Sequence, residues 1–330
     1  MLALLCPGQG SQTPGFLTPW TERSAVRDRL ERLSAVAGVD LLAHGTTSDA
    51  ETIRDTAVAQ PLIVAAGLAV LPELLDGIDR AHDAHGADDA ATGPDVVAGH
   101  SVGEITAAVV AGVLTEDDAI TLVRERGRAM AEAAAVVPTG MSAVLGGDPD
   151  DVAAALERHG LTAANVNGAG QVVAAGPLDR LAALAQDPPT RSRVVPLQVA
   201  GAFHTAYMAP AVEALARCAA DVTAADPRRR LLSNADGAVV GDGREVLDRL
   251  VGQVSRPVRW DLCQATLADM GVTAVLELPP AGTLTGLARR ALPGVETLAL
   301  RTPDDLDAAR DLVLRHAERT SAAQTSGARA

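Results

Sequence analysis

The segment Gly99-His100-Ser101-Val102-Gly103 has the G-x-S-x-G spacing of a serine nucleophile. It follows a short apolar run at 95–98 and precedes a helix-forming stretch, which is the strand-to-helix context that this motif requires. The flanking glycines lack the Cβ atoms that would clash in so sharp a turn. The helix would place free N–H groups and the positive end of its dipole where an oxyanion forms. We therefore expect Ser101 to be a nucleophile and the backbone N–H of Val102 to be an oxyanion donor.

A serine nucleophile needs a base, and the chain has seven histidines. Most of them stand in polar or helix-surface contexts. His100 is adjacent to Ser101, but neighbouring side chains on such a turn point apart, so we expect His100 to line the pocket. His204 follows an apolar strand that ends near Val199, and α/β folds place active-site loops at the carboxyl ends of strands. His204 is therefore the candidate base.

The composition excludes several classes of protein. All 28 basic residues are arginine, so chemistry that needs a protein lysine, such as Schiff-base, pyridoxal-phosphate or P-loop chemistry, is excluded. The 42 acidic residues give a net charge of −14, and the aromatic residues are only two Trp, one Tyr and two Phe. A nucleic-acid partner would need a basic face or a stacking platform, so we expect none.

The cysteines and the apolar runs indicate a cellular location. Cys6, Cys218 and Cys263 are scattered and show no CxxC spacing, so we expect neither a disulfide framework nor a metal site. The apolar N-terminal run ends at Pro7, too early for a signal sequence. No continuous apolar run approaches the roughly 18 residues of a membrane span. We therefore expect a cytoplasmic protein with no membrane partner.

Short apolar runs separated by longer helical patterns must position these residues. The runs with the length of buried strands lie at 2–6, 95–98, 230–233, 274–278 and 296–300. The stretches between them favour helices, among them a nearly all-apolar one at 60–75 that predicts a buried helix. This alternation predicts a mainly parallel sheet covered by helices.

The pattern between residues 131 and 199 is different. It predicts strand, helix, strand, strand, helix and strand at 141–146, 149–159, 161–166, 171–175, 178–185 and 193–199. This order is typical of a ferredoxin-like unit. We therefore expect a large domain formed by 1–130 and 200–318, a small inserted subdomain at 131–199, and a small, polar, disordered tail at 319–330.

Five separated motifs occur in a fixed order along the chain. They are Gly8-Gln9-Gly10-Ser11-Gln12, Ala59-Gln60-Pro61, Gly99-His100-Ser101-Val102-Gly103-Glu104, Arg126-Gly127-Arg128-Ala129-Met130 and Gly201-Ala202-Phe203-His204. Two later stretches, 253–260 and 282–287, extend the pattern. Together these motifs resemble those of the malonyl-CoA:acyl carrier protein transacylases, the acyltransferase family of fatty-acid and polyketide synthesis. The resemblance covers about residues 1–300.

The resemblance implies an α/β fold, in which an α/β-hydrolase-like large domain with a mainly parallel sheet carries an inserted ferredoxin-like small subdomain. It implies that Ser101 and His204 work as a dyad and that the main-chain carbonyl of Gln253 orients the histidine. A carbonyl can accept the imidazole Nδ1–H and fix the tautomer, so no aspartate is needed. Gln9 matches the residue whose main-chain N–H is the second oxyanion donor, beside Val102.

The resemblance also implies a set of substrate-binding residues. Arg126 matches the arginine that clamps the free carboxylate of malonate, which a planar guanidinium can bind through both oxygens. Phe203 resembles the malonyl-type form of its motif, in which a bulky ring leaves little room for a 2-methyl group. His100, Gln60 and Asn165 complete the set, Asn165 from an N-x-N segment of the small subdomain.

The implied reaction is a ping-pong transfer of a malonyl group from malonyl-CoA to the phosphopantetheine thiol of an acyl carrier protein, through a malonyl-serine and with no metal or bound cofactor. Malonyl-CoA and the carrier protein are the expected partners, and we expect a monomer. A serine thioesterase or editing acyl hydrolase, with water as acceptor, is an alternative on the same fold. A non-catalytic carrier-protein docking module is another. Fatty-acid and polyketide roles both fit the sequence.

Overall fold

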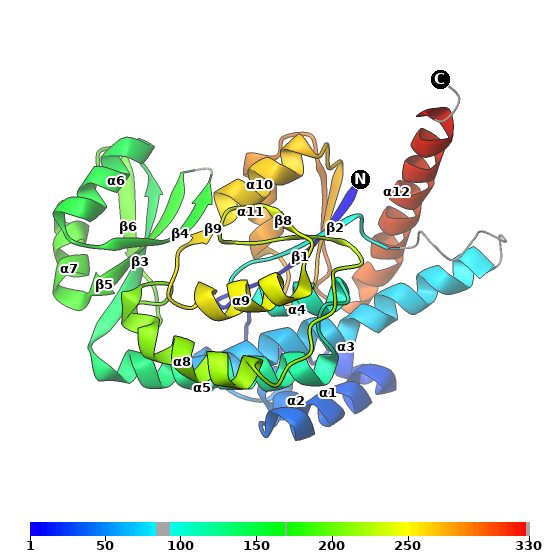
Figure 1. The fold of residues 1–330 in the computed structure, drawn as a ribbon, viewed down its shortest axis with the longest axis horizontal. Helices are drawn as coiled ribbons and strands as arrows, with labels where there is room; N and C mark the ends of the chain where they lie inside the picture. Colours follow the sequence, from blue (N-terminus) through cyan, green and yellow to red (C-terminus); the bar gives the residue numbers. More distant parts are fainter. Residues whose placement is uncertain (84–92, 169, 328–330) are drawn as a thin grey trace.

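A six-stranded sheet forms the centre of the larger part of the chain, in the order β11-β10-β1-β2-β7-β8 (Figure 1). The computed structural model describes residues 1–83, 93–168 and 170–327, without the side chains of 77–83 and 317–327. The strands of this sheet are β1 (Leu2–Cys6), β2 (Val96–Gly99), β7 (Arg230–Leu232), β8 (Val239–Val240), β10 (Ala274–Glu277) and β11 (Glu296–Ala299). Neighbouring strands run parallel except for the antiparallel pair of β7 and β8.

Alternate residues of β1 enter two separate apolar cores. Leu2 and Leu4 pack into one core, and Ala3 and Leu5 pack into the other. Helices that contribute to the first core are α1 (Ser24–Ala37), α2 (Leu41–Thr46), α3 (Thr56–Asp83), α4 (Gly103–Val110), α5 (Glu116–Val136), α8 (Ala209–Ala219), α9 (Gly243–Gln253) and α12 (Leu306–Gly327). The second core involves α10 (Trp260–Asp269) and α11 (Thr283–Ala291). Because both faces of the sheet are covered at its centre, the central strands β1 and β2 are continuous apolar runs.

Helix α3 corrects one expectation from the sequence. Its residues Thr56–Asp76 are long and apolar enough to cross a membrane, yet 72% of the most apolar stretch is buried inside the fold, where α3 packs against α1, α5 and α12. The expectation that no segment reaches this length counted only continuous apolar runs. Polar residues such as Gln60 and Glu73 interrupt the run, but the stretch as a whole remains apolar. We interpret α3 as a core helix.

A second, five-stranded sheet lies at the opposite end of the molecule from α12 (Figure 1). Its order is β6-β3-β5-β4-β9, with β3 (Thr139–Gly146), β4 (Thr162–Gly168), β5 (Gln171–Pro177), β6 (Ser192–Pro196) and β9 (Val258–Arg259). The strands β3 to β6 pair antiparallel, and α6 (Pro149–Arg158) and α7 (Leu178–Gln186) pack against them through a core that includes Val144, Leu156 and Leu184. Residues 139–196 thus follow the order strand, helix, strand, strand, helix, strand.

The fifth strand of the small sheet comes from elsewhere in the chain. Val258 and Arg259 of β9 pair in parallel with Asn165 and Val166 of β4. The expected division of the chain places β9 with the large domain, because a two-residue strand has no pattern that the sequence could show. The pairing ties β4 to the segment that follows α9, and so holds the small sheet against the larger part of the chain.

The C-terminal segment also differs from the expectation. The structure places residues 319–327 in helix α12 rather than in a disordered tail, and 328–330 lie outside the described residues. A capping box formed by Thr302 and Asp305 precedes α12. Once a helix has an anchored start, each further residue adds a backbone hydrogen bond without a new nucleation cost.

Candidate active site

Ser101 lies in a sharp turn between β2 and α4, with a backbone φ of +54°. Residues other than glycine rarely adopt this left-handed region, so the surroundings must hold the strain. A Cβ on Gly99 would lie 2.1 Å from the carbonyl group of Gly103, and one on Gly103 would lie 2.2 Å from the carbonyl oxygen of Cys6. The close approach of strand, turn and helix therefore requires glycine at both positions.

His204 is in direct contact with the serine. Its Nε2 lies 2.7 Å from Ser101 Oγ, and its Nδ1 lies 3.0 Å from the main-chain oxygen of Gln253. Since a carbonyl can only accept, Nδ1 carries the proton and Nε2 is free to accept the serine hydroxyl. Gln253 is the last residue of α9, so its carbonyl is one of those at a helix C-terminus that have no donor within the helix.

The surroundings of His204 keep its imidazole neutral. Burial lowers the pKa of His204 to about 3, and the positive charge of Arg126 acts in the same direction. The imidazole therefore has its proton acceptor available at neutral pH.

The loop after β1 approaches the nucleophile turn from the neighbouring strand. A Cβ on Gly8 would lie 2.6 Å from the carbonyl oxygen of His100, and the side chain of Gln9 donates to Thr56 Oγ1 at 3.2 Å. Within the described part of the chain, the backbone N–H groups of Gln9 and Val102 donate to no protein acceptor. Both groups are available to an oxyanion formed at Ser101.

Arg126, on α5, is the buried cation of this site. Its Nη2 lies 3.3 Å from Ser101 Oγ and donates to Gln253 Oε1 at 2.7 Å, while its Nη1 donates to Gln60 Oε1 at 2.5 Å. Burial lowers the pKa of Arg126 to about 10, against the opposing effect of Glu104. The guanidinium is therefore charged at neutral pH, within reach of an acyl group on the serine.

The dyad opens into a pocket whose walls come from both sheets. Its lining consists of Gln9, His100, Ser101, Val102, Arg126, Met130, Met141, Asn165, Val173, Leu197, Val199, Phe203 and His204. A wider cleft continues outward and shares several of these residues. Among the described residues, the Oδ1 atom of Asn165 is buried without a hydrogen-bond partner, so it can accept from a ligand.

His100 and Phe203 form parts of the pocket wall. The Nε2 atom of His100 lies 2.9 Å from Asn167 Oδ1, and its ring meets Trp260 edge-on with the centroids 5.5 Å apart. Burial lowers the pKa of His100. Its ring is thus engaged with Asn167 and Trp260, while His204 is the histidine that contacts the serine. Phe203 is buried and directly precedes His204.

Gln60 does not reach the pocket wall, although we expected it among the substrate-binding residues. It is 1% exposed and lies behind Arg126, with its Nε2 directed at Met130 Sδ, 3.5 Å away. Gln60 lies on α3, which packs against α5, and it is not among the residues that line the acyl pocket or the outer cleft. Gln60 therefore acts on a substrate only through Arg126.

Three polar groups of the site were not found from the sequence: Asn234, Glu104 and the side chain of Gln253. Asn234 is fully buried, and its Oδ1 accepts the backbone N–H of Ser101 at 2.7 Å. Glu104 accepts the backbone N–H of Asn234 at 2.7 Å and is also hydrogen-bonded to Gln253 Nε2. The signal that could have found Asn234 is its place just after β7, the strand beside β2, because the carboxyl ends of parallel strands meet at one edge.

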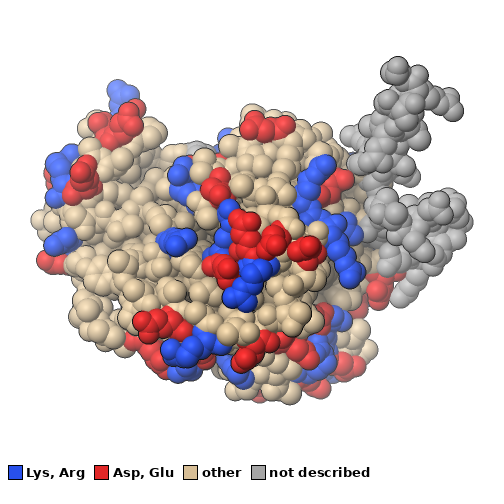
Figure 2. Space-filling view, viewed as in Figure 1, with Lys and Arg blue, Asp and Glu red and all other residues tan. Residues whose placement is uncertain are grey.

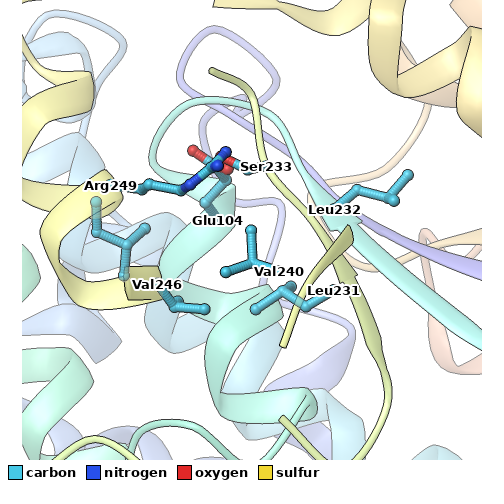
Figure 3. Close-up of a pocket in the computed structure, with 8 residues that line it drawn as sticks. Glu104, Leu231, Leu232, Ser233, Val240, Val246 and Arg249 are labelled. Carbon is cyan, nitrogen blue, oxygen red and sulfur yellow. The ribbon is translucent and has the colours of Figure 1, made fainter. Parts of the chain in front are cut away.

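A small cavity lies behind the nucleophile turn and is separate from the acyl pocket. Its walls are mostly apolar and come from Leu231, Leu232, Ser233, Val240, Val246 and Leu250, together with Glu104 and Arg249. Figure 3 shows the polar ends of Glu104 and Arg249 directed toward one another beside Ser233. Burial raises the pKa of Glu104 to about 7, against the opposing effect of its hydrogen bonds and of the cations Arg126 and Arg249.

No group of three or more His, Cys, Asp or Glu side chains suited to a metal ion occurs within residues 1–83, 93–168 and 170–327. The chemistry that the described side chains themselves provide is nucleophilic, with a serine, a neutral histidine and a nearby cation.

These features define a serine acyltransferase, and comparisons with known proteins agree. Residues 3–302 match the family model of the acyl transferase domain. The malonyl CoA-acyl carrier protein transacylase of Mycobacterium tuberculosis is 52% identical over 308 residues, which cover 93% of this chain and 98% of that protein. The transacylase of the same name from Escherichia coli K12 is 33% identical, covering 94% of this chain and 99% of that protein.

Solved structures extend the likeness to three dimensions. The crystal structure of MCAT from M. tuberculosis has a TM-score of 0.86 at 51% identity, covering 94% of this chain and 99% of that one. PlMCAT, solved in complex with the type II PKS acyl-carrier protein AntF, has a TM-score of 0.83 at 30% identity, covering 94% and 99%. The chain belongs to the malonyl-CoA:acyl carrier protein transacylase family, which confirms the resemblance inferred from its motifs.

Proposed function

We propose that this chain transfers a malonyl group from malonyl-CoA to the phosphopantetheine thiol of an acyl carrier protein through a malonyl ester of Ser101. The observation that carries the proposal is the buried guanidinium of Arg126, 3.3 Å from the nucleophilic oxygen. A cation at this distance suits an acyl group that ends in a carboxylate. An acetyl group would leave the cation unpaired, at a cost of several kcal/mol by order of magnitude.

In the first half of the reaction, Ser101 Oγ attacks the thioester carbonyl of malonyl-CoA and its proton passes to His204 Nε2. The Gln253 carbonyl holds the Nδ1–H of the imidazolium that forms. The N–H groups of Val102 and Gln9 bind the oxyanion. The C–S bond then breaks, and His204 returns the proton to the leaving CoA thiolate, which departs as the thiol.

In the second half, the phosphopantetheine thiol of the carrier protein enters along the same cleft. His204 accepts the thiol proton as the sulfur attacks the malonyl ester, and the same two N–H groups bind the second oxyanion. The C–O bond to Ser101 breaks, and the proton on Nε2 passes to the serine oxygen. The enzyme is thereby restored without a metal or a bound cofactor.

Phe203 and Arg126 together would set the choice of acyl group. Arg126 selects for the distal carboxylate, and the Phe203 ring fills the space that a 2-methyl substituent would need. Asn165, also in the lining of the pocket, offers an unpaired acceptor. The proposed substrate is therefore malonyl-CoA rather than acetyl-CoA or methylmalonyl-CoA.

We further propose that the larger part of the chain is an α/β-hydrolase-like domain and that residues 131–199 form a ferredoxin-like subdomain. The parallel strand order with a nucleophile turn after β2 supports the first assignment. The strand-helix order of residues 139–196 supports the second, with β9 as an additional strand from outside the subdomain.

The same proposal covers the setting of the reaction: a cytoplasmic monomer that meets a soluble carrier protein, with no membrane or nucleic-acid partner. Free Cys6, Cys218 and Cys263 suit a reducing compartment. Although the net charge is −14, Figure 2 shows arginines interspersed with acidic side chains on the face in view. Arg54 also lines the outer cleft, so the entry path is not uniformly acidic.

The experiment is intact-protein mass spectrometry after brief exposure to malonyl-CoA, followed by addition of holo acyl carrier protein. We expect a malonyl adduct on the wild type, its absence in Ser101→Ala, and its passage to the carrier protein. CoA release with free malonate and no passage to the carrier would instead favour the thioesterase. No adduct and no CoA release with malonyl-CoA or acetyl-CoA would contradict both enzymes and favour a docking module.

A further inference from the structure

The groups that hold Arg126 are neutral. Gln60 and Gln253 present their side-chain oxygens to the two terminal nitrogens of the guanidinium, at 2.5 and 2.7 Å. Within the described residues, Arg126 forms no ion pair with a carboxylate. The third contact is the serine hydroxyl, which is also uncharged.

Another arginine of the same helix is held differently. Arg128, two residues further along α5, pairs with the carboxylates of Glu125 and Glu132 on the exposed face. A buried cation without an adjacent counter-ion is much more costly than an exposed, paired one. The fold keeps such a cation at the base of the acyl pocket, which indicates that its counter-ion arrives with a ligand.

The nearest buried carboxylate, that of Glu104, is separated from Arg126 by the Gln253 side chain. Gln253 Oε1 accepts from Arg126, while its Nε2 donates to Glu104 and, at 3.1 Å, to the main-chain oxygen of Ser101. A carboxylate only accepts and a guanidinium only donates, so the two together fix the orientation of this amide. Glu104 thus acts on the cation from a distance and makes no direct contact with the guanidinium.

The side-chain amide of Gln60 is also oriented by the different groups that face its oxygen and its nitrogen. Its Nε2 faces the weakly accepting Met130 Sδ, and its Oε1 is therefore turned to Arg126. Gln60 is 1% exposed, so no solvent competes for the amide. Both amides position the guanidinium, and neither cancels its charge.

We propose that the side-chain amides of Gln60 and Gln253 determine the preference for a carboxylate-bearing acyl group, because they hold Arg126 in place without neutralising it. The inference rests on the proposed function and names two positioning residues for its selectivity. A carboxylate in either place would form an internal ion pair with Arg126. That pair would compete with the carboxylate of malonate.

The first test compares Gln60→Glu with Gln60→Met, a matched variant of similar size that brings no charge. The quantity measured is the ratio of kcat/KM for malonyl-CoA to that for acetyl-CoA. We expect the ratio to fall about 100-fold in Gln60→Glu, as for a close buried charge pair. We expect a smaller fall, by no more than about tenfold, in Gln60→Met, which loses one hydrogen bond to the guanidinium but brings no opposing charge. Lowering the pH should restore part of the ratio only in Gln60→Glu, since protonation removes the added charge.

A second test moves the carboxylate without changing the composition of the site. The double variant Glu104→Gln/Gln253→Glu keeps the net charge but places the negative group against Arg126. We expect the same loss of preference for malonyl-CoA, with thermal unfolding of each variant as the control for folding.

The outcomes separate the inference from the proposed function. A wild type that shows no preference for malonyl-CoA contradicts both. A wild type that prefers malonyl-CoA, with the same preference in Gln60→Glu and in the double variant, overturns only the inference. An equal loss in Gln60→Glu and Gln60→Met also overturns it, because the amide oxygen would then matter for geometry and not for charge.

Discussion

Asn234 holds the backbone that leads into the reactive residue, since its Oδ1 accepts the N–H of Ser101 at 2.7 Å and its Nδ2 donates to the carbonyl of Gly99 at 2.8 Å. The asparagine follows β7, which pairs with β2. The left-handed φ of Ser101 is therefore maintained by a buried side chain from the neighbouring strand. This leaves the next N–H along the chain, that of Val102, to face the pocket.

The first prediction concerns this asparagine. Asn234→Ala leaves two buried backbone groups without partners, so we expect a loss of about 2–4 kcal/mol in the free energy of unfolding. We also expect Ser101 to be acylated at least about tenfold more slowly, because the turn is no longer held in its reactive geometry. Urea unfolding and single-turnover acylation by malonyl-CoA measure the two effects.

Asn234→Asp provides the matched comparison for this residue. It keeps an acceptor for the Ser101 N–H but brings an oxygen against the carbonyl oxygen of Gly99, so we expect an intermediate acylation rate. If folded Asn234→Ala acylated Ser101 at the wild-type rate, the asparagine would have no role in positioning the nucleophile.

The second prediction concerns the approach of the β1 loop to the nucleophile turn. A Cβ on Gly8 would lie 2.6 Å from the carbonyl oxygen of His100, so Gly8→Ala must displace the loop that carries Gln9. We expect acylation to slow by about 100-fold, the effect of losing one oxyanion donor. Gly241→Ala is the control, since a Cβ there meets no heavy atom within 4 Å. Equal acylation rates in the two variants would mean that Gln9 is not an oxyanion donor.

The third prediction is a pH profile for acylation. Burial and Arg126 lower the pKa of His204 to about 3, so the base stays neutral well below pH 6.5. Since kcat/KM reports the free enzyme, we expect it to stay level between pH 8 and about pH 5 and to fall only in more acidic solution. Rapid-quench measurements of the malonyl adduct across this range give the profile. A midpoint near pH 6.5 would show that His204 is not shielded as described.

The fourth prediction concerns stability and Glu104. Its pKa is about 7 in the folded protein against 4.5 as the ordinary value, so the folded state binds more protons than the unfolded state between these pH values. The stability that Glu104 contributes is therefore present below about pH 4.5 and is lost as the pH rises through 7. As the pH rises across this window, the free energy of unfolding of Glu104→Gln should increase relative to that of the wild type. A difference that does not change with pH would contradict the raised pKa.

The fifth prediction concerns Phe203 and extender choice. Phe203→Ala removes a ring from the lining of the acyl pocket. If this ring excludes a 2-methyl group, as proposed, kcat/KM for methylmalonyl-CoA should rise relative to malonyl-CoA by about tenfold, as for one methyl group in an apolar pocket. Competition between the two thioesters, read by mass spectrometry of the adduct, gives this ratio directly. An unchanged ratio would show that another residue excludes the methyl group.

The sequence was sufficient for the groups that carry strong local signals. The G-x-S-x-G motif with its apolar run and helix located Ser101. The strand expected to end near Val199 ends at Pro196, at the edge of the small antiparallel sheet, so the rule for parallel strands did not place His204, and its motif Gly201-Ala202-Phe203-His204 identified it instead. The glycines that flank Ser101 and the burial of α3 follow from local composition in the same way, whereas the order of the strands in the sheet does not. The tail at 319–327 was expected to be disordered because it is small and polar, whereas the structure continues helix α12 to Gly327.

Apart from the place of Asn234 just after β7, the supporting groups carry no local signal, because their partners are distant in the chain. Asn234 lies 133 residues from Ser101, and the contact of Gln253 with Glu104 spans 149 residues. Gln253 was identified through its carbonyl, whereas its side chain links Arg126 to Glu104. Such contacts depend on how α4, α5 and α9 pack against one another, and this packing cannot be inferred from the pattern of a single sequence. Strand β9 was not predicted for the same reason, since its two residues form a strand only by pairing with β4.

The central claim is that Ser101 accepts an acyl group whose carboxylate is held by Arg126. The most direct test exposes the wild-type protein to equal concentrations of malonyl-CoA and acetyl-CoA, quenches within one turnover, and locates the adduct by peptide mass spectrometry. The account predicts a malonyl group on the peptide that contains Ser101, with little acetyl group beside it. Comparable amounts of acetyl and malonyl adduct, or an adduct on another residue, would contradict it.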